Sequence, residues 1–159
     1  MCQAQQSQGR TFIKIYGVQT ENLIDFLGHG KSDRLHEFPA DLRFYEAQQV
    51  IAFLKEKHFS NVDIIGSSGG ALVAINVALK APQLISKVIA DSFEGETPLK
   101  QFTEHVVADR ELSKHNEEAK SFYQYMQGHD WESVVDNDTS AIVCLLYTSP
   151  SPRDRQKSR

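Results

Sequence analysis

The stretch from Val62 to Ile75 constrains the fold of this 159-residue chain more than any other. A short apolar run ends at Gly66, two serines and two glycines follow, and an apolar helix-like segment begins at Gly69. Because glycine has no side chain, it lets the backbone bend tightly and lets a strand and a helix approach closely. The stretch therefore predicts a buried strand, a sharp turn and a helix in immediate succession.

The turn contains the pattern G-x-S-x-G, formed by Gly66, Ser68 and Gly70. In the nucleophile elbow, which has this pattern, a serine sits on a strand-to-helix turn with its hydroxyl exposed. The bare pattern is weak, because small residues cluster in many turns. Its place between a strand pattern and a helix pattern favours Ser68 as a nucleophile, whereas Ser67 is expected only to shape the turn.

Apolar periodicity predicts the remaining elements. Pro39 stands at a helix start and Pro82 stops a helix. The expected strands cover 11–16, 22–26, 62–65 and 87–91, and the expected helical patterns cover 40–57, 69–80, 98–127 and 131–147. Strands that alternate with helices at this spacing predict an α/β fold of right-handed βαβ units in a parallel sheet.

Several residues of possible functional importance lie at the carboxyl ends of three expected strands. Ser68 lies at one such end, Asp25, Gly28 and His29 lie at another, and Asp91 and Ser92 lie at a third. In parallel sheets of this kind, functional residues gather at the carboxyl ends of the strands. We therefore expect any active site at that edge of the sheet.

Three segments together resemble the α/β-hydrolase superfamily. The segment 25–33 is similar to its strand-end D-x-x-G-x-G-x-S sequence, 62–82 to its elbow strand and nucleophile helix, and 87–92 to the strand that follows. The resemblance covers residues 22–98, roughly half of the chain. It implies a partial α/β-hydrolase fold, with a parallel sheet, flanking helices and a helical cap-like region at 98–147.

The resemblance also implies a function. It indicates a serine hydrolase of the esterase or lipase kind, which acts on a small-molecule ester-like substrate without a cofactor. Ser68 would be its nucleophile, and the backbone N–H of Gly69 would contribute to the oxyanion hole. The alternative interpretation is a non-catalytic hydrolase-like binding module or an inactive fragment.

The chain departs from the family pattern at both ends of the resemblance. No His-Gly turn precedes the expected strand at 22–26, so the second oxyanion donor is not identified. The family's acid and histidine follow later strands, but residues 148–159 contain no histidine and no strand pattern. Their composition is typical of a disordered tail or, the preferred interpretation, of vector sequence joined to a broken reading frame. We therefore expect a fragment without its acid and histidine.

The histidines are the candidate bases for Ser68, since a serine hydroxyl needs a nearby base. The sequence places them at His29, His36, His58, His105, His115 and His129. We expect His29 to be a structural turn residue and His58 to end a helix on the side opposite the active edge. The last three are expected to be surface or interhelical residues of the cap-like region.

Two carboxylates were weighed in the same way. Asp91 follows an apolar strand and fits a catalytic acid, but a polar strand-end residue that caps the next loop is the preferred interpretation. Asp25 is likewise expected to form hydrogen bonds at a strand end rather than to act as a base.

The segment from Gly28 to Ser32 contains the Gly-Lys-Ser of a phosphate-binding P-loop. The complete motif needs glycine at position 25, where the chain has Asp25. The residues after Ser32 predict no helix whose dipole could hold a phosphate. No C-x-x-C or H-E-x-x-H spacing supports a metal. We therefore expect no nucleotide, metal or other cofactor.

Charge and hydropathy limit the partners. The net charge is −4, and residues 149–159 carry four basic residues against one acid, which leaves −7 for the rest. Such an acidic body argues against nucleic acid as a partner. No run reaches the roughly 18 apolar residues of a membrane helix, and residues 1–10 lack the apolar core of a signal peptide. We expect a cytoplasmic protein without a membrane partner.

The expected organisation has four parts. Residues 1–10 form a disordered N-terminus, 11–97 a hydrolase-like core, 98–147 the cap-like region, and 148–159 a disordered or artefactual tail. Cys2 and Cys144 are far apart and are expected to remain thiols rather than pair, with Cys144 buried. The oligomeric state is left open, although a sheet without its later strands would have an unpaired edge.

Overall fold

A computed structural model of the chain describes residues 12–17, 20–39, 41–93, 95 and 99–148. The described elements are β1 (Phe12–Gly17), β2 (Thr20–Leu23), α1 (Leu42–Glu56), β3 (Val62–Ser67), α2 (Gly69–Lys80), a 3-10 helix (Pro82–Leu84), β4 (Ile85–Asp91), α3 (Lys100–Ser113), α4 (Glu117–Gln127) and α5 (Trp131–Thr148). The expected disorder of residues 1–10, the position of Cys2 and residues 149–159 lie outside the described part.

The chain divides into two compact units. The sheet unit consists of the described residues up to Ile24 together with 46–93, and the helical unit consists of 25–45 together with the described residues from Gly95 onward. Helix α1 begins in the helical unit and continues in the sheet unit from Glu46. The expected boundary at 97 and 98 stays a prediction, because 96–98 lie outside the described residues.

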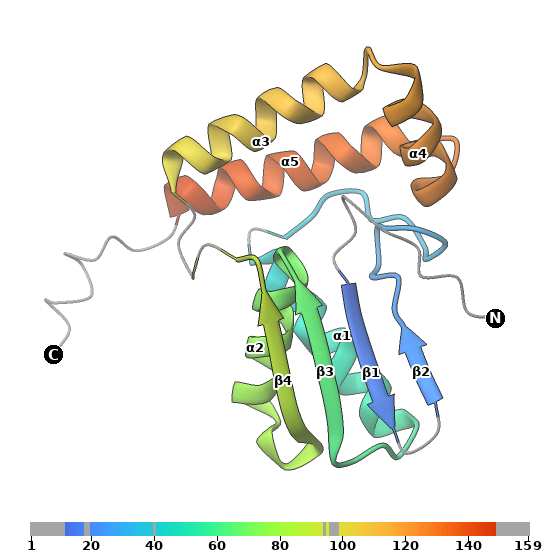
Figure 1. Ribbon diagram of the computed structural model, residues 1–159, viewed down its shortest axis with the longest axis vertical. Coiled ribbons are helices and arrows are strands. Elements are labelled where there is room, and N and C mark those ends of the chain that lie inside the picture. Colours follow the sequence, from blue (N-terminus) through green and yellow to red (C-terminus); the bar gives the residue numbers. More distant parts are fainter. Residues whose placement is uncertain (1–11, 18–19, 40, 94, 96–98, 149–159) are drawn as a thin grey trace, which may run out of the picture. The chain divides into compact units, whose positions relative to one another are not determined.

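The sheet unit is built on four strands in the order β2-β1-β3-β4, which lie side by side in Figure 1. Strands β3 and β4 run parallel, with Ile64 opposite Val88. Strand β1 pairs antiparallel with β3 on one side and with β2 on the other.

The expectation of a parallel sheet is therefore wrong for two of the three described strand pairings, because β1 runs opposite to both β2 and β3 and only β3 and β4 pair in parallel. The reason is the length of the connections. Only residues 18 and 19 separate β1 from β2, which suits a hairpin, whereas a parallel pair needs a crossover of about a dozen residues or more. Helix α2 provides that crossover between β3 and β4.

The chain combines helices and strands, while the complete α/β-hydrolase fold stays a prediction.

The core of the sheet unit lies between the strands and α2, which contacts β1, β3 and β4. Along β3 the side chains alternate between buried and half-buried positions, with Val62 and Ile64 at most 1% exposed. Helix α2 buries Val73 and Val77, as its apolar sequence predicts. This packing holds the carboxyl end of β3 and the first turn of α2 in close contact.

The helical unit is built on α5, which contacts both α3 and α4. The helical pattern expected over 98–127 is two helices, because Asn116 caps a new one: its side chain accepts a hydrogen bond from the Ala119 N–H at 2.9 Å. Gly128, with φ 94, ends α4. At the start of α5, Trp131 is 3% exposed and stacks on Tyr123 of α4, with ring centroids 5.5 Å apart.

The segment 25–45 belongs to the helical unit although it lies far from α3–α5 in the sequence. Phe38 and Leu42 form a buried cluster with Ala141 of α5, and Leu35 packs against it. Cys144, on α5, is half-buried rather than fully buried as expected.

Candidate functional site

Ser68 occupies the turn between β3 and α2. Its backbone has φ 54 and ψ −124, which is the mirror image of the extended conformation and is readily adopted only by glycine. A non-glycine residue in such a region costs on the order of 1–3 kcal/mol. The Ser68 residue is exposed. The sharp, strained turn that the G-x-S-x-G motif predicts is confirmed, while the role of Ser68 as a nucleophile stays a prediction.

Gly66 explains how the strand and the helix meet so closely. A Cβ atom on Gly66 would overlap the carbonyl group of Gly70 and would lie 2.8 Å from the backbone nitrogen of Ala71. All of these neighbours are backbone atoms, which cannot move aside as a flexible side chain can. The first glycine of the motif is therefore required by packing.

Two hydrogen bonds hold the Ser68 backbone. Its N–H donates to the Asp91 carbonyl at 2.9 Å, and its own carbonyl accepts from the Ala71 N–H at 3.0 Å. Gly69 is the first residue of α2, and the first N–H groups of a helix have no acceptor within the helix. Because they also lie at the positive end of the helix dipole, the Gly69 amide suits an oxyanion, and its contribution there stays a prediction.

The neighbouring strand end carries Asp91 and Ser92. Both residues are exposed, and the Ser92 hydroxyl donates to the Asp91 carboxylate at 2.9 Å. Ser92 also has a positive φ, 54°. The Asp91 side chain is thus engaged locally, in keeping with the expected polar strand-end role.

Within the sheet unit, the sequence contains one histidine, His58. It is exposed and follows the end of α1, four residues before β3 begins. Ser68 follows the other end of β3, whose six residues span about 20 Å. His58 is therefore not placed to accept the Ser68 proton. The histidines at 36, 105, 115 and 129 are exposed in the helical unit.

In the helical unit, Asp25 organises the turn that follows it. Its carboxylate accepts the Lys31 N–H at 3.0 Å, and its carbonyl accepts the Ser32 hydroxyl at 2.6 Å. Gly30 has φ 54, and a Cβ on it would overlap the Asp25 carboxylate. These contacts are the hydrogen-bonding role that the sequence predicts for Asp25.

The backbone N–H groups of the same turn already donate hydrogen bonds to acceptors within the protein. Those of Gly28, His29 and Ser32 donate to backbone carbonyls at 2.8–3.0 Å, that of Lys31 to Asp25, and that of Gly30 to the side chain of Gln127 at 2.6 Å. Residues 33–39 after the turn are not helical. A P-loop needs such N–H groups for its phosphates, so the geometry argues against nucleotide binding here.

His29 does more than shape a turn. Its ring stacks on Phe38, with centroids 4.8 Å apart, and its Nε2 lies 3.7 Å from Oδ1 of Asp138 on α5. Sequence reasoning did not single out Asp138. The available signal was its position three residues after Val135 and three before Ala141, on the face of α5 that is buried.

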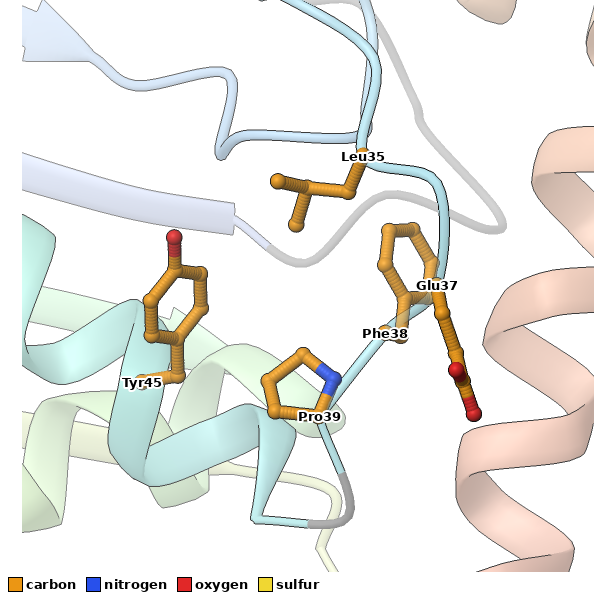
Figure 2. A pocket seen from close by; sticks show the side chains of 5 residues that line it. All are labelled: Leu35, Glu37, Phe38, Pro39 and Tyr45. Carbon is orange, nitrogen blue, oxygen red and sulfur yellow. The ribbon is translucent and has the colours of Figure 1, made fainter.

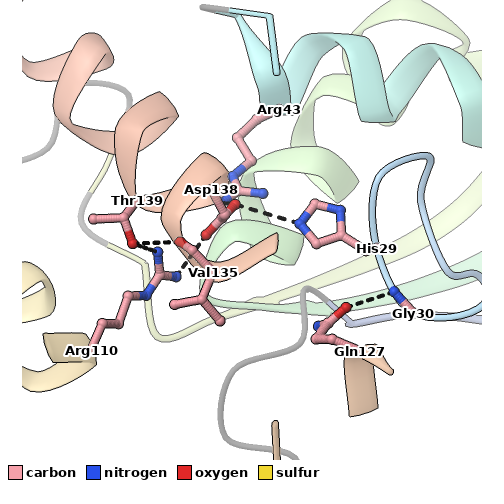
Figure 3. A network of polar contacts seen from close by, with 8 residues as sticks. All are labelled: His29, Gly30, Arg43, Arg110, Gln127, Val135, Asp138 and Thr139. Atoms are coloured by element: carbon pink, nitrogen blue, oxygen red, sulfur yellow. Dashed lines mark hydrogen bonds and ion pairs between the residues drawn. The ribbon is translucent and has the colours of Figure 1, made fainter. Parts of the chain in front are cut away.

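Asp138 is the centre of a buried polar network, shown in Figure 3. Its carboxylate is 2.7 Å from Arg110 Nη2 and 3.3 Å from Arg43 Nη2, and Arg110 also donates to the Thr139 hydroxyl at 2.8 Å. Burial alone would raise the pKa of Asp138. The positive charge of Arg43, the contact with His29 and the charge of Arg110 outweigh burial and hold that pKa well below its usual range.

Arg34 links the turn to the α4–α5 corner. Its guanidinium forms a two-point ion pair with Asp130, at 2.7 Å and 2.8 Å, and donates to the carbonyls of Gly30 and Gln127. The hydrogen bond from Arg34 lowers the pKa of Asp130 to about 2. Together with the His29 contact, this ion pair ties 25–34 to helices that follow more than 90 residues later.

A shallow pocket of about 350 Å³ lies in the segment 35–45, as Figure 2 shows. It is lined by Leu35, Glu37, Phe38, Pro39 and Tyr45. Its lining comes from that segment alone, so it differs from the pocket walled by the cap-like region that the resemblance implies.

No helix among the described residues is long and apolar enough to cross a membrane. No three side chains of histidine, cysteine, aspartate or glutamate within the described part converge as metal ligands would.

No protein-family model matches the chain. A stretch of 76 residues is 40% identical to a protein of Cyberlindnera fabianii named "Probable alcohol acetyltransferase". The match covers 47% of this chain and 20% of that protein, so it spans one fifth of the relative's length. The relative is, by its name, an acyl-transferring enzyme.

The strain at Ser68 predicts a gain in stability when it is removed. Ser68→Gly is expected to raise the free energy of unfolding by about 1 kcal/mol, because glycine adopts this backbone conformation without a Cβ penalty. Ser68→Ala keeps the Cβ and should change stability by less than about half of that. Urea unfolding of the three proteins measures the difference, and equal stability of the glycine and alanine variants would show that the turn is unstrained.

Proposed function

We propose that this chain carries the nucleophile region of a serine enzyme that cleaves or transfers acyl groups, with Ser68 as the nucleophile. The observation that supports the proposal most is the backbone of Ser68, at φ 54 and ψ −124 in an exposed turn between β3 and α2. Strained residues of this kind persist where the surrounding structure holds them, and they cluster at active sites. The acyl-transferring relative agrees with this chemistry.

The reaction has two stages. In the first, the Ser68 Oγ attacks the carbonyl carbon of an ester or thioester, a base takes its proton, and the oxyanion accepts the Gly69 N–H. The carbon–oxygen or carbon–sulfur bond breaks, the leaving alcohol or thiol takes up the proton, and the acyl group stays on Ser68. In the second stage, the hydroxyl of water or an alcohol attacks the acyl carbon and gives its proton to the base. The bond from that carbon to the Ser68 Oγ breaks, and the Oγ takes up the proton.

The incoming hydroxyl decides between two activities. Water would release a carboxylic acid, which is the esterase reaction implied by the hydrolase resemblance. An alcohol would give a new ester, and the relative's name favours this second candidate. Adding ethanol to the assay separates the two, since transfer produces ethyl ester at the expense of acid.

For the 159-residue chain, we expect negligible ester hydrolysis. The sheet unit that carries Ser68 has His58 as its one histidine, at the other end of β3, and a serine hydroxyl is a poor nucleophile without a base. A fluorophosphonate probe should leave this chain unlabelled. Labelling that disappears in Ser68→Ala would contradict this expectation and would show that a base is already present.

The test of the function uses a chain whose coding sequence continues beyond Tyr147 and supplies an acid and a histidine. There, Ser68→Ala should lower kcat/KM for aryl esters by about 10³-fold or more, since removal of a serine nucleophile has effects of this size or larger. Ser67→Ala is the matched control and should stay within a few-fold of wild type. If turnover with alanine at position 68 equals that with serine, the enzyme proposal fails and a binding module is the remaining interpretation.

A further inference from the structure

Two exposed serines at neighbouring strand ends have a positive φ. Ser68 follows β3 and Ser92 follows β4, and each has a φ of 54°. A residue with a side chain rarely adopts a positive φ. The strained backbone raises the free energy of the folded state, so contacts elsewhere in the fold must compensate for it. The first serine belongs to the elbow, but the motif says nothing about the second.

The two strand ends are connected through Asp91. In the parallel register of β3 and β4, Ser67 lies opposite Asp91. The Asp91 carbonyl accepts the Ser68 N–H at 2.9 Å, and the Asp91 carboxylate accepts the Ser92 hydroxyl at 2.9 Å. Ser92 is therefore linked to Asp91 in two ways. Its backbone follows Asp91 directly, and its hydroxyl donates to the Asp91 carboxylate, while the Asp91 carbonyl accepts the Ser68 N–H.

We propose that Ser92 is a positioning residue for Ser68. Its positive φ turns the chain directly after Asp91 and directs the Asp91 carbonyl at the Ser68 amide, and its hydroxyl holds the Asp91 side chain away from that contact. The catalytic part of this proposal rests on the proposed role of Ser68 as a nucleophile. The backbone part, which concerns the Ser68 amide, is independent of it.

The consequence for chemistry follows from the strain. A strained residue keeps its conformation only where its neighbours fix it. The Ser68 backbone is held by two hydrogen bonds, one from the Ser68 N–H to the Asp91 carbonyl and one from the Ala71 N–H to the Ser68 carbonyl. Without the first of them, Ser68 can relax, and its Oγ and the Gly69 N–H move together. A displacement of about 1 Å can cost about 100-fold in rate.

Three substitutions at position 92 separate backbone from hydroxyl. Ser92→Ala removes the hydroxyl alone, Ser92→Gly also lacks the hydroxyl but adopts the positive φ without strain, and Ser92→Val brings a β-branched residue that resists a positive φ. The matched control is Asn61→Val. Asn61 also has a positive φ, 56°, but lies directly before β3, at the end of the strand away from Ser68.

The experiment has two readouts. Hydrogen exchange of the Ser68 amide is measured by NMR in the 159-residue chain, and acyl transfer is measured in the chain extended beyond Tyr147. Ser92→Val should accelerate amide exchange by about tenfold or more and lower kcat by about 10- to 100-fold with KM within about twofold. Ser92→Gly and Ser92→Ala both lose the hydroxyl and should lie between wild type and Ser92→Val in both readouts, with glycine nearer to wild type because it adopts a positive φ without strain. Asn61→Val should leave both readouts unchanged.

The proposal is overturned if Ser92→Val leaves the Ser68 amide as protected as in wild type. It is also overturned if Asn61→Val accelerates exchange as much, because a general loss of stability would then explain the effect. If wild type and every variant fail to transfer acyl groups, the proposed function fails, and amide exchange alone still decides whether Ser92 positions Ser68.

Discussion

Replacing Asp138 by alanine should destabilise the helical unit by about 3–5 kcal/mol, the range for breaking a buried ion pair from one side. The Asp138 side chain is 11% exposed, and its carboxylate lies among Arg110, Arg43 and His29. Its loss leaves the guanidinium groups of Arg43 and Arg110 in a buried place without their carboxylate partner, while a cavity forms on α5. Urea unfolding, followed by the fluorescence of Trp131 in the same unit, measures the effect.

Asp136→Ala is the matched control for this prediction. Asp136 lies on the same helix and pairs with Lys114 at 2.6 Å, but its side chain is 54% exposed. Exposed ion pairs contribute at most about 1 kcal/mol. If the two alanine variants lose similar stability, Asp138 is not the centre of a buried network.

The same carboxylate makes the stability dependent on pH. Because the folded-state pKa of Asp138 lies well below its usual value, its stabilising effect is complete above the unfolded pKa of about 3.9. The effect is lost progressively as the pH falls below that value. Asp130, with a pKa of about 2, contributes in the same direction. Asp138→Asn should therefore lose less stability than wild type between pH 5 and pH 3, and an unchanged slope would contradict the prediction.

Gly66→Ala should have the second large effect on stability, a loss of about 3 kcal/mol, at the upper end of the usual cost of overpacking. The added methyl group would overlap the Gly70 carbonyl and approach the Ala71 nitrogen. Strand β3 and helix α2 would have to separate, and the Ser68 turn between them would change shape. Chemical denaturation followed by circular dichroism measures the loss.

Gly95→Ala is the comparison for Gly66. Gly95 has a φ of 93° and nothing within 4 Å of an added Cβ. Alanine there is strained by the positive φ but contacts no neighbouring atom, so the free energy of unfolding should fall by about 1 kcal/mol. A loss at Gly66 no larger than that at Gly95 would show that the strand and the helix are not in the close contact described.

Local elements could be predicted from the sequence because their signals are local. The elbow needs glycine at 66 for packing, and its strand and helix each show their own periodicity. Helix α2 begins at Gly69 and ends at Lys80, as expected. Most other strands and helices differ from the expected ones by a few residues at their ends, as in β2, which stops at Leu23 rather than at 26. The helical pattern over 98–127 is divided into α3 and α4.

The directions of the strands were harder to predict from the sequence than the strands themselves. The expected βαβ pattern holds where α2 connects β3 to β4, but the hairpin of β1 and β2 reverses the chain. Alternation of apolar residues is the same in parallel and antiparallel strands. The informative feature was the short connection, since only five residues separate the expected strands 11–16 and 22–26, too few for the crossover that a parallel pair needs.

The sequence by itself therefore determined the strand, turn and helix around Ser68, because neighbouring residues along the chain specify them through glycine packing and apolar periodicity. Only the tertiary structure decided which distant residues meet: His29, Arg43 and Arg110 around Asp138, and Asp91 beside Ser68. The physical reason is that the position of a charged side chain or a carbonyl in the sequence does not indicate which distant residue it will contact. Such pairs become visible only when packing brings their segments together.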